Sequence, residues 1–567
     1  MVVRERTHSL EEPTGSFDRD DPPVLGANPF VGLTRRQVGA ALGRLLQRAA
    51  VEPRVAAAVA LDTARELARV VMGRSDVAPD RGDKRFADPA WAANPLYHRL
   101  LQAYLVQRRA LSQLVDRVQL TAKNRERARF AMSLVTEAAA PTNTLVGNPR
   151  ALARARQTRG QSLVDGLRHF GHDLRHNGGM PSMVDTRPFK VGVNLAVTPG
   201  QVVHRTELFE LIQFAATTAR TFTRPLVVIP PQINKYYISD IAPGRSLVEY
   251  TVASGIPYFA ISWRNPTAAQ RDWDLDAYVA ACHEALHVAC AISGTSDVNV
   301  AGVCAGGITL ACLVGHLAAT GQPLVHSATW MVATLDTSQE STVGLLASRA
   351  TIEAARARSR RAGILDGKEL GRMFAWLRPN DLVWNYWVNN YLLGQDPPAF
   401  DILYWNADTT NLPAGLHSDF LDLFESNGLA RPGTLQVLAT QVDLRLVDCD
   451  TYVVAGTTDH IVPWTGAYQT TQLLGGSSEF VLSSSGHIQA IVNPPGNKKA
   501  AYLTRPGAPP PDPLAWRQDA TSHQGSWWDH WLSWLGERSG DDKPAPISLG
   551  SPRHPPLDPA PGRYVHL

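Results

Sequence analysis

Six short apolar runs in the later part of the chain constrain its fold more than any other feature. Each run has four to eight residues, the usual length of a buried strand, and stretches with helical periodicity separate the runs. The expected strands are 225–230, 258–263, 298–303, 328–335, 451–455 and 479–482. Such alternation is typical of a parallel sheet with crossover helices on its faces. The sequence therefore predicts an α/β protein.

The residues before this sheet differ from it in composition and in hydrophobic periodicity. Residues 1–25 are polar, with acidic and proline-containing clusters, and are expected to form a mobile arm. Helical periodicity begins after Thr34, a suitable N-cap residue, and predicts a mostly helical N-terminal domain over 26–185. The sheet and its helices are expected to form a second domain over 186–567.

An insertion interrupts this second domain. Residues 336–448 lie between two expected strands and are more numerous than a simple crossover needs, so we expect them to form a cap over the sheet. The aromatic residues of 384–391 could pack a core or wall a dry acyl tunnel. Trp527, Trp531 and Trp534 recur at helical spacing and are expected to dock a last helix.

Composition excludes several classes of protein. The net charge is only +3, so neither a nucleic-acid-binding surface nor a polybasic membrane anchor is indicated. Five cysteines, an odd number without close spacing, argue against a disulfide framework and for a reducing compartment. The first residues lack the apolar run of a signal peptide, and no stretch reaches the roughly 20 apolar residues that span a bilayer. A cytoplasmic protein without a membrane span is expected.

The sharpest local signal is the sequence GVCAGG at residues 302–307. It follows one expected strand and opens a helix-like run, which is the context of a nucleophile elbow. In such an elbow, small neighbours let a strained turn expose the nucleophile, which here would be Cys304. The backbone N–H of Ala305 would help to form an oxyanion hole. This context predicts an α/β-hydrolase fold for the second domain and makes that domain catalytic.

An elbow of this kind requires an acid after a later strand and a histidine near the end of the domain. Asp459 follows the expected strand 451–455, and His487 follows 479–482. Either residue alone is also an ordinary turn or loop residue, but their order after Cys304 favours a catalytic triad. The N–H of Ile233, soon after the strand 225–230, is the candidate for a second oxyanion donor.

A competing motif is His283-Glu284-Ala285-Leu286-His287, which matches the H-E-x-x-H zinc signature. No third ligand follows at the metzincin spacing, where Gly294 and Asp297 stand, and the helix directly precedes the elbow strand as an outer crossover should. We therefore expect no metal site. The remaining cysteines lie in apolar surroundings and are expected to be core thiols: Cys282, Cys290, Cys312 and Cys449.

Long sequence blocks from about Asn28 onward carry a more specific pattern. They include DPAWAANPLYHRLLQAYL, APTNTLVGNP, PPQINKYYISDIAPGRSL, GVCAGG, RPNDLVWNYWVNNYLLG, FDILYWNADTTNLP, VAGTTDHIVPW and SSGHIQAIVNPPGN. Through these blocks the chain resembles the single-subunit polyhydroxyalkanoate synthases, classes I and II. The N-terminal blocks are most similar to class II, the medium-chain type, although the elbow has Val303 and Ala305 where that type usually reads GACSGG. The resemblance implies that Cys304, Asp459 and His487 are the catalytic residues.

The same resemblance implies a reaction and its partners. The enzyme would polymerise (R)-3-hydroxyacyl-CoA into polyester with release of CoA, through a thioester on Cys304 and without metal or organic cofactor. The growing polyester chain, the surface of a polyester granule and a second copy in a homodimer are the expected partners. The expected location is the cytoplasm, at such granules.

The chemistry suits these residues. A thiol that attacks a CoA thioester exchanges one thioester for another, and a thiolate leaves readily when a hydroxyl attacks next. A free thiol has a pKa of about 8.5, so His487 is expected to act as its base. Asp459 could orient His487 or help to deprotonate the incoming hydroxyl. The alternatives are a cysteine hydrolase or thioesterase, a zinc peptidase, and a non-catalytic granule-coating protein.

Overall fold

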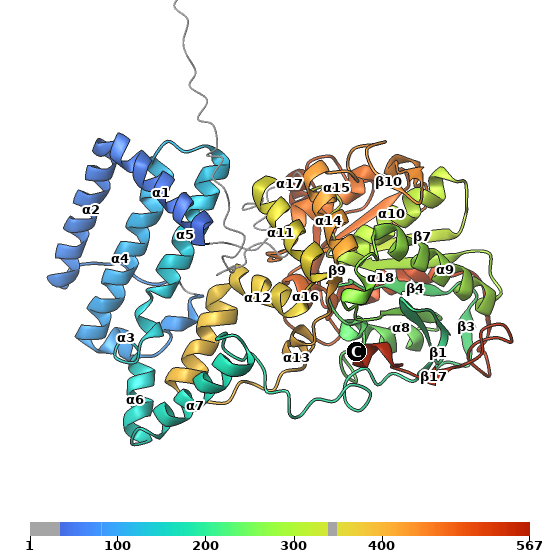
Figure 1. Cartoon of the computed structure of the whole chain (residues 1–567), viewed down its shortest axis with the longest axis horizontal. Helices are drawn as coiled ribbons and strands as arrows, with labels where there is room; N and C mark the ends of the chain where they lie inside the picture. Colours follow the sequence, from blue (N-terminus) through green and yellow to red (C-terminus); the bar gives the residue numbers. More distant parts are fainter. Residues whose placement is uncertain (1–34, 81, 338–348) are drawn as a thin grey trace, which may run out of the picture.

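The computed structural model describes residues 35–80, 82–337 and 349–567. Within these ranges an eleven-stranded mixed sheet forms the centre of the fold (Figure 1). Its order is β15 (Thr521–Gln524), β14 (Ala501–Thr504), β13 (Ser478–Ser483), β12 (Asp450–Gly456), β7 (Val325–Met331), β6 (Val298–Val303), β4 (Leu226–Ile229), β5 (Tyr258–Trp263), β2 (Phe209–Phe214), β1 (Gly200–Arg205) and β17 (Asp558–Pro559). The neighbours from β13 to β5 run parallel, and the pairs on both sides are antiparallel.

The six expected strands are all present, and one of them is misplaced. The predictions for 258–263 and 298–303 coincide with β5 and β6, and those for β4, β12 and β13 differ by one or two residues at their ends. The expected strand 328–335 was set too far along the chain, because β7 ends at Met331 and Val332 turns away with φ 49°.

The expectation of a parallel sheet needs a further correction. The antiparallel strands at both edges were missed, and their sequences explain why. Strand β15 is mostly exposed and polar, so it lacks an apolar run. Strands β1 and β2 form a hairpin before the first expected strand, in a stretch where the sequence analysis placed none. The result is a parallel centre with antiparallel margins, an arrangement common in large sheets.

Both faces of the sheet are covered. Val227 and Ile229 of β4 join a core with α9 (Leu275–Ser293) and α10 (Ala305–Ala319). Leu226 and Val228 face the other way, toward α8 (Leu247–Ala253) and α18 (Trp527–Gly536). This alternation follows from the two-residue period of a strand and buries both of its faces. Shorter helices complete the layers: η3 (Tyr236–Ser239), η4 (Ala268–Gln270), α15 (Trp464–Leu473), α16 (His487–Ile491), α17 (Pro513–Gln518) and η8 (Tyr564–His566).

Helix α18 confirms the prediction of a docked last helix. Trp527 and Trp531 are fully buried, and Trp534 is half-buried. The indole N–H groups of Trp527 and Trp528 donate to the carbonyl oxygens of Ala490 and Ile491 at 2.7 and 3.1 Å. The last helix therefore holds the end of α16, the short helix that begins with His487.

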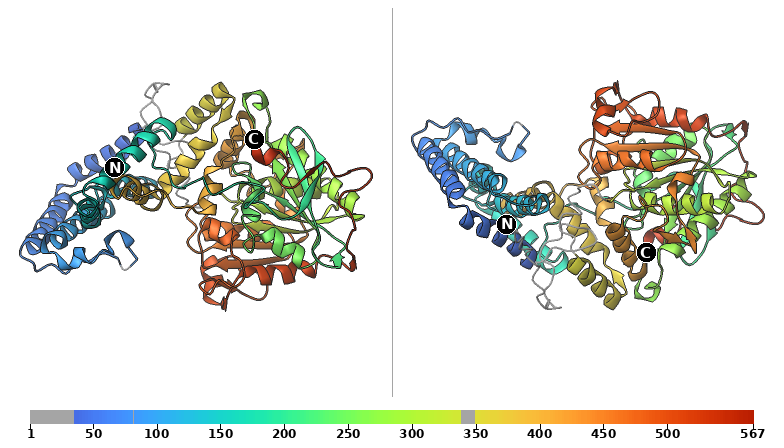
Figure 2. Two further views of the ribbon diagram at one scale, coloured as in Figure 1. Left: turned by 90° about the horizontal axis from the view of Figure 1, so that it is seen from below. Right: turned by 90° about the horizontal axis from the view of Figure 1, so that it is seen from above.

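The N-terminal part is helical, as expected, and lies to one side of the sheet (Figures 1 and 2). Its elements are α1 (Arg35–Val51), α2 (Pro53–Val71), η1 (Lys84–Phe86), α3 (Ala90–Ala93), α4 (Pro95–Arg117), α5 (Ala122–Ala138), η2 (Pro141–Asn143), α6 (Pro149–Gln157) and α7 (Gln161–His176). Asn94 caps α4 by accepting from Leu96 N at 2.9 Å, and Pro95 occupies the first helical position, where its missing N–H costs nothing. The expected arm 1–25 and the N-cap Thr34 lie outside the described residues.

The described residues between β7 and β12, which are 332–337 and 349–449, form mostly helices. Their elements are α11 (Arg349–Ala362), β8 (Ile364–Leu365), α12 (Gly367–Leu377), the π-helical turns η5 (Asn380–Trp384) and η6 (Trp387–Leu392), α13 (Asp401–Ala407), β9 (Leu412–Pro413), α14 (Ala414–Ser426), β10 (Gln436–Val437), β11 (Thr440–Gln441) and η7 (Leu444–Leu446). A small pair of β3 (Arg220–Phe222) and β16 (Asp542–Pro544) lies elsewhere, beside the main sheet.

The aromatic residues of 384–391 contact the N-terminal helices. Trp387 Nε1 donates to Asn143 O at 3.1 Å, and Tyr391 OH donates to Asp173 Oδ2 at 2.8 Å. The ring of Phe170 on α7 packs edge-on against Trp387 and Tyr391. These contacts favour the packing interpretation of the cluster over the tunnel wall, and they connect α7 to the inserted residues.

Among the described residues, α9 alone is long and apolar enough to cross a membrane, by the length and composition of its 19 residues. However, 56% of its most apolar window is buried inside the protein, with Val279, Cys282 and Leu286 packed in the core beneath the sheet. A crossover helix in this position is apolar because it packs between the sheet and its neighbouring helices.

Candidate active site

The residues 302–307 form the sharp strand-to-helix turn that their sequence predicts. Cys304 lies between the end of β6 and the start of α10, with φ 51° and ψ −121°. This left-handed φ is rare for a residue with a side chain and is typical of a turn held under strain at a functional position. Cys304 N donates to Met331 O at 2.9 Å, and Cys304 O accepts from Gly307 N at 2.9 Å. The turn therefore fixes Cys304 at the carboxyl edge of the parallel strands.

Two glycines make this turn possible. A Cβ on Gly306 would lie 2.3 Å from Ile229 O, and one on Gly302 would lie 2.7 Å from the Cα of Gly307. Both distances are shorter than any real Cβ contact, so a larger residue would push the elbow away from β4 or open the turn. Glycine is therefore required at both positions, because the neighbouring backbone atoms leave no room for a side chain.

Asp459 and His487 meet at the same edge of the sheet. Asp459 follows β12 and His487 opens α16 after β13, and His487 Nδ1 lies 2.6 Å from Asp459 Oδ2. The other carboxylate oxygen, Oδ1, accepts from the N–H groups of Ile461 and Val462 at 2.9 Å each. Both side chains are almost fully buried. The amides of Ile461 and Val462 were missed by the sequence analysis, although an Asp two or three residues before the amides is the usual signal of such a turn.

The electrostatics place a proton on His487. Burial lowers its pKa, but the negative charge of Asp459 and the charge and hydrogen bond of Cys304 outweigh burial and raise the pKa to about 10. Because Nδ1 is bonded to Asp459, Nε2 is the nitrogen left for Cys304. Asp459 and His487 are therefore hydrogen-bonded to each other, and Cys304 is close enough to His487 to raise its pKa.

We expect that Cys304→Ala lowers the pKa of His487. Two of the causes that raise this pKa come from Cys304 and disappear with the sulfur, whereas Asp459 remains. The check is a pH titration of the protein with ¹⁵N-labelled histidine, followed by NMR of the imidazole nitrogens. An unchanged titration midpoint in the variant would show that Cys304 and His487 do not interact.

The neighbouring histidine behaves differently. His460 follows Asp459, but burial, the positive charge of Arg378 and that of His487 lower its pKa to about 4 against the opposing effect of Asp459. Its Nδ1 is buried without a hydrogen-bond partner in the part of the chain that the structure describes. His460 is therefore neutral at physiological pH, and the paired histidine of this site is His487.

The two expected oxyanion donors flank the elbow. Ala305 is the first residue of α10, where amides have no partner within the helix. Ile233 lies in the loop after β4, and Gln232 ties that loop to α10 by donating from Nε2 to Thr309 Oγ1 at 2.8 Å. Across the described ranges, neither amide donates to a protein acceptor. Both are thus available to a bound group.

Comparison with known proteins decides the family. The model "Poly-beta-hydroxybutyrate polymerase (PhaC) N-terminus" matches residues 82–251, and the model "alpha/beta hydrolase fold" matches 225–494. Poly(3-hydroxyalkanoate) polymerases 1 and 2 of Ectopseudomonas oleovorans are both 48% identical, over 96% and 95% of this chain and 97% and 96% of their own. The chain belongs to the poly(3-hydroxyalkanoate) polymerase family. The Cupriavidus necator "Poly(3-hydroxyalkanoate) polymerase subunit PhaC" is 40% identical over 87% of this chain and 84% of its own.

Membership of the polymerase family confirms the resemblance seen in the sequence blocks, and the match over 225–494 confirms the α/β-hydrolase fold. Identity to the two E. oleovorans polymerases exceeds that to the C. necator protein, in agreement with the N-terminal blocks. Val303 and Ala305, the two residues that depart from the elbow sequence usual in class II, are both buried at the turn.

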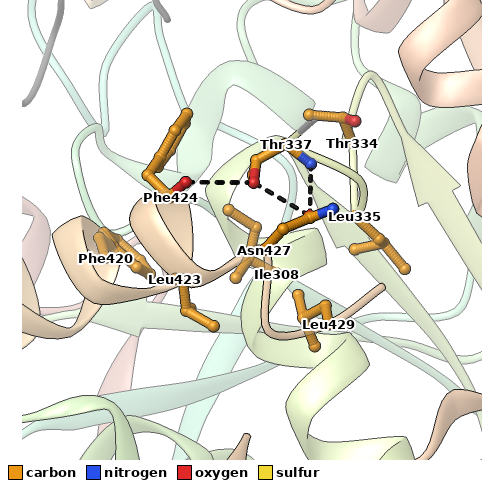
Figure 3. Close-up of a pocket in the computed structure, with 9 residues that line it drawn as sticks. All are labelled: Ile308, Thr334, Leu335, Thr337, Phe420, Leu423, Phe424, Asn427 and Leu429. Carbon is orange, nitrogen blue, oxygen red and sulfur yellow. Dashed lines mark hydrogen bonds between the residues drawn. The ribbon is translucent and has the colours of Figure 1, made fainter. Parts of the chain in front are cut away.

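A small apolar pocket lies one helical turn beyond Cys304 (Figure 3). The space among its lining atoms is about 280 Å³, a volume that includes open solvent. Ile308 of α10 forms one wall, and the residues after β7 and on and after α14 form the others: Thr334, Leu335, Thr337, Phe420, Leu423, Phe424, Asn427 and Leu429. The aromatic residues of this pocket, Phe420 and Phe424, lie on α14. They belong to the inserted residues but not to the cluster at 384–391.

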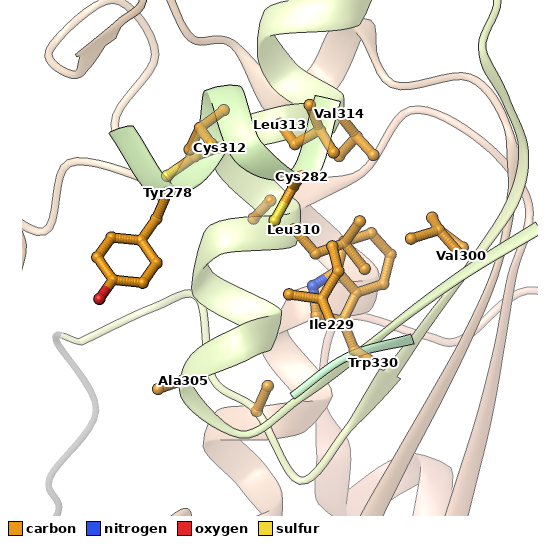
Figure 4. Close-up of a cluster of buried hydrophobic side chains, with 14 of the residues drawn as sticks. Ile229, Tyr278, Cys282, Val300, Ala305, Leu310, Cys312, Leu313, Val314 and Trp330 are labelled. Carbon is orange, nitrogen blue, oxygen red and sulfur yellow. The ribbon is translucent and has the colours of Figure 1, made fainter. Parts of the chain in front are cut away.

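The other cysteines are not placed for chemistry. Cys282 and Cys312 face each other across α9 and α10 in the core, and burial raises the pKa of both thiols far above neutrality (Figure 4). Burial also raises the pKa of Cys290, and burial with two neighbouring aspartates raises that of Cys449 to about 12. The prediction of core thiols is confirmed for the three buried cysteines, and Cys449 is half-buried against the same core.

The H-E-x-x-H motif has a structural explanation. His283 Nε2 lies 3.1 Å from both His287 Nε2 and Gln322 Oε1 on the outer side of α9. Glu284, which a zinc peptidase would need beside the metal, instead bonds His204 Nε2 of β1 at 2.8 Å. No group of three or more His, Cys, Asp or Glu arranged for a metal occurs among the described residues. Glu284 is therefore paired with His204 and is not placed between the two histidines.

We expect His283→Ala and His287→Ala, singly or together, to keep activity within about tenfold of the parent, because trimming partly exposed side chains of a crossover helix costs little. Chelators should have no effect on the parent. The measurement is CoA release from an acyl-CoA before and after treatment with a chelator. Activity lost to the chelator and restored by zinc would contradict this prediction.

Proposed function

We propose that this protein polymerises (R)-3-hydroxyacyl-CoA into polyester and releases CoA, with Cys304, His487 and Asp459 as its catalytic residues. The observation that carries the proposal is the strained elbow cysteine, whose electrostatic effect raises the pKa of an Asp-paired histidine. The two relatives named poly(3-hydroxyalkanoate) polymerase that match nearly the whole chain support it.

Loading begins from a thiolate–imidazolium pair within the protein. The raised pKa of His487 keeps the proton of the Cys304 thiol on Nε2 of His487. The thiolate then attacks the carbonyl carbon of the acyl-CoA thioester, forming a new C–S bond and a tetrahedral oxyanion. Collapse of this intermediate breaks the bond to CoA, and His487 gives its proton to the departing CoA sulfur. The product is an acyl group on Cys304 and a neutral His487.

Elongation uses the same histidine in its other state. Acylation removes the charge of Cys304, so one cause of the raised His487 pKa disappears and the imidazole becomes a usable base. His487 takes the proton of a 3-hydroxyl group as that oxygen attacks the Cys304 thioester, an ester bond forms and the Cys304 thiolate leaves. The thiolate–imidazolium pair is restored, which balances the proton over one cycle.

Both steps pass through an oxyanion that needs preorganised donors. We assign the amides of Ala305 and Ile233 to this role, because both are unpaired with protein acceptors in the described ranges and flank Cys304. Donors of this kind stabilise charge that develops only in the transition state, which raises kcat more than it changes KM.

The division of the chain belongs to the same proposal. Residues 26–185 would form the helical N-terminal domain, and 186–567 the catalytic domain, with 336–448 as a cap that limits the access of water to the acyl-enzyme. The apolar pocket between α10 and α14 supports this role, because it is of the chemistry that an acyl chain prefers and begins one turn from the nucleophile. The growing polyester, the granule surface, a homodimer and a cytoplasmic location complete the proposal.

The test is to supply the purified protein with (R)-3-hydroxybutyryl-CoA or (R)-3-hydroxyoctanoyl-CoA and to measure released CoA and product size. We expect CoA release with polymer as the product. Release of CoA with free hydroxy acid would identify a thioesterase. Polymer binding without CoA release would identify a granule-coating protein.

A further inference from the structure

The loop that carries Ile233 is fastened to a segment of the chain some 170 residues away. We call residues 405–410 the strap. Residues 405–407 end α13 and residues 408–410 follow it, within the block FDILYWNADTTNLP. We propose that the strap, through Trp405 and Asp408, positions the Ile233 amide as an oxyanion donor. This inference rests on the proposed function, and it assigns Trp405, Asp408 and Tyr237 as positioning residues for that reaction.

Backbone contacts join the two segments directly. Thr410 N donates to Ile233 O at 3.2 Å, and Asn234 and Thr409 form an antiparallel bridge. Trp405 Nε1 donates to Lys235 O at 2.8 Å, and the indole is buried. The carbonyl groups on both sides of Asn234 are therefore held by the strap. The bond to Ile233 O fixes the peptide plane that follows Ile233, and this restricts the rotation about the Ile233 backbone that would turn its N–H away from the elbow.

A partly buried polar pair strengthens the connection. Tyr237 OH donates to Asp408 Oδ2 at 2.8 Å, and the Tyr237 side chain is fully buried. Burial and the nearby Asp408 carboxylate raise the pKa of Tyr237 far above neutrality, so the phenol stays a donor. The charge of Asp408 also opposes the effect of burial on Lys235, whose pKa is lowered. A hydrogen bond from a phenol to an ionised carboxylate is among the stronger ones available to a protein.

The other side of the loop is fastened to the elbow helix. Gln232 bonds Thr309 of α10, and the absence of a Cβ on Gly306 lets α10 approach Ile229 and Pro230. Trp263 Nε1 donates to Pro230 O at 3.0 Å. The loop of Ile233 is thus held on one side by Gln232, which bonds α10, and on the other side by the strap. Since the Ile233 N–H has no acceptor within the described ranges, these contacts leave the N–H unpaired and fixed in place.

The experiment removes single hydrogen bonds of the strap and keeps the rings. Trp405→Phe deletes the bond to Lys235 O, and Tyr237→Phe deletes the bond to Asp408. Removing an oxyanion donor costs about 10² to 10³ in kcat, so we expect a displaced donor to cost about tenfold per variant, and more in the double variant. KM should stay within about twofold, because the donor acts in the transition state.

A second readout separates positioning from general damage. Alkylation of Cys304 by iodoacetamide is a displacement at carbon that forms no oxyanion, so its rate should be unchanged in both variants. The rate is measured on the Cys304 peptide by mass spectrometry, beside the rate of CoA release from (R)-3-hydroxybutyryl-CoA and from (R)-3-hydroxyoctanoyl-CoA.

Two matched variants serve as controls. Trp531→Phe deletes a buried indole bond to Thr329 Oγ1 at 3.1 Å, and Tyr391→Phe deletes a phenol bond to Asp173 Oδ2 at 2.8 Å. Both should retain the parent rate of CoA release.

The inference is overturned if the strap variants release CoA at the parent rate, if alkylation slows as much as CoA release, or if the controls lose as much activity as the strap variants. Parent protein that alkylates at Cys304 but releases no CoA from either substrate would instead remove the proposed function, and this inference with it.

Discussion

Replacing Cys304 with alanine abolishes CoA release and covalent labelling by acyl-CoA. The loss should be on the order of 10⁶ in kcat, the effect of deleting a nucleophile whose partners remain. The fold should survive, because alanine and cysteine both carry a Cβ. The steric cost of the positive φ of 51° is therefore the same in the variant as in the parent. The measurement is release of CoA together with radiolabel bound to the denatured protein.

Cys312→Ala is the matched control for this variant. It lies on the same helix, is fully buried and has a thiol whose pKa is raised far above neutrality by burial, so we expect it to retain most activity. Label that still binds covalently to the Cys304→Ala protein would show that another residue is the nucleophile.

Asp459→Asn should slow both loading and elongation by about 10⁴, the effect seen when a triad aspartate is neutralised. The asparagine oxygen can still accept from Ile461 and Val462, which leaves its NH₂ group facing His487 Nδ1. Two donors cannot pair, so the imidazole takes the tautomer with its hydrogen on Nε2 and can no longer accept the proton of Cys304. Rapid quench with one equivalent of labelled acyl-CoA measures loading, and excess substrate then measures elongation.

The ratio of the two effects decides the role of Asp459. Its side chain is fully buried behind His487, and both oxygens already have partners in the protein. We therefore expect equal slowing of the two steps, since a carboxylate in this position acts through His487. Elongation slowed much more than loading would mean that Asp459 contacts the incoming hydroxyl itself.

The parallel centre of the sheet was predictable because its strands are buried on both faces, so their sequences are short, continuous apolar runs. Strand β15 is exposed and polar, and only its pairing with β14 defines it. The end of β7 was predicted wrongly, because the apolar residues continue past Met331 whereas the backbone turns at Val332. Apolar patterning reports burial, and it does not report where a strand stops pairing.

The candidate site was predictable to a greater degree than the surrounding structure. The order of Cys304, Asp459 and His487, each after a strand, follows from the topology of a parallel sheet whose carboxyl ends meet at one edge. The contacts of Trp405 and Asp408 with the Ile233 loop were not predictable, because they depend on how the inserted residues fold back over the sheet. The aromatic cluster at 384–391 likewise gave no sign in sequence that it would contact α7.

The most direct test of the account is mass spectrometry of the protein quenched milliseconds after mixing with (R)-3-hydroxyacyl-CoA. We predict a hydroxyacyl group on the peptide that contains Cys304, sensitive to hydroxylamine as a thioester, which grows by whole monomer units when more substrate is added. An acyl group on any other peptide, or an acyl group on Cys304 that never grows and is lost only as free hydroxy acid, would contradict the account.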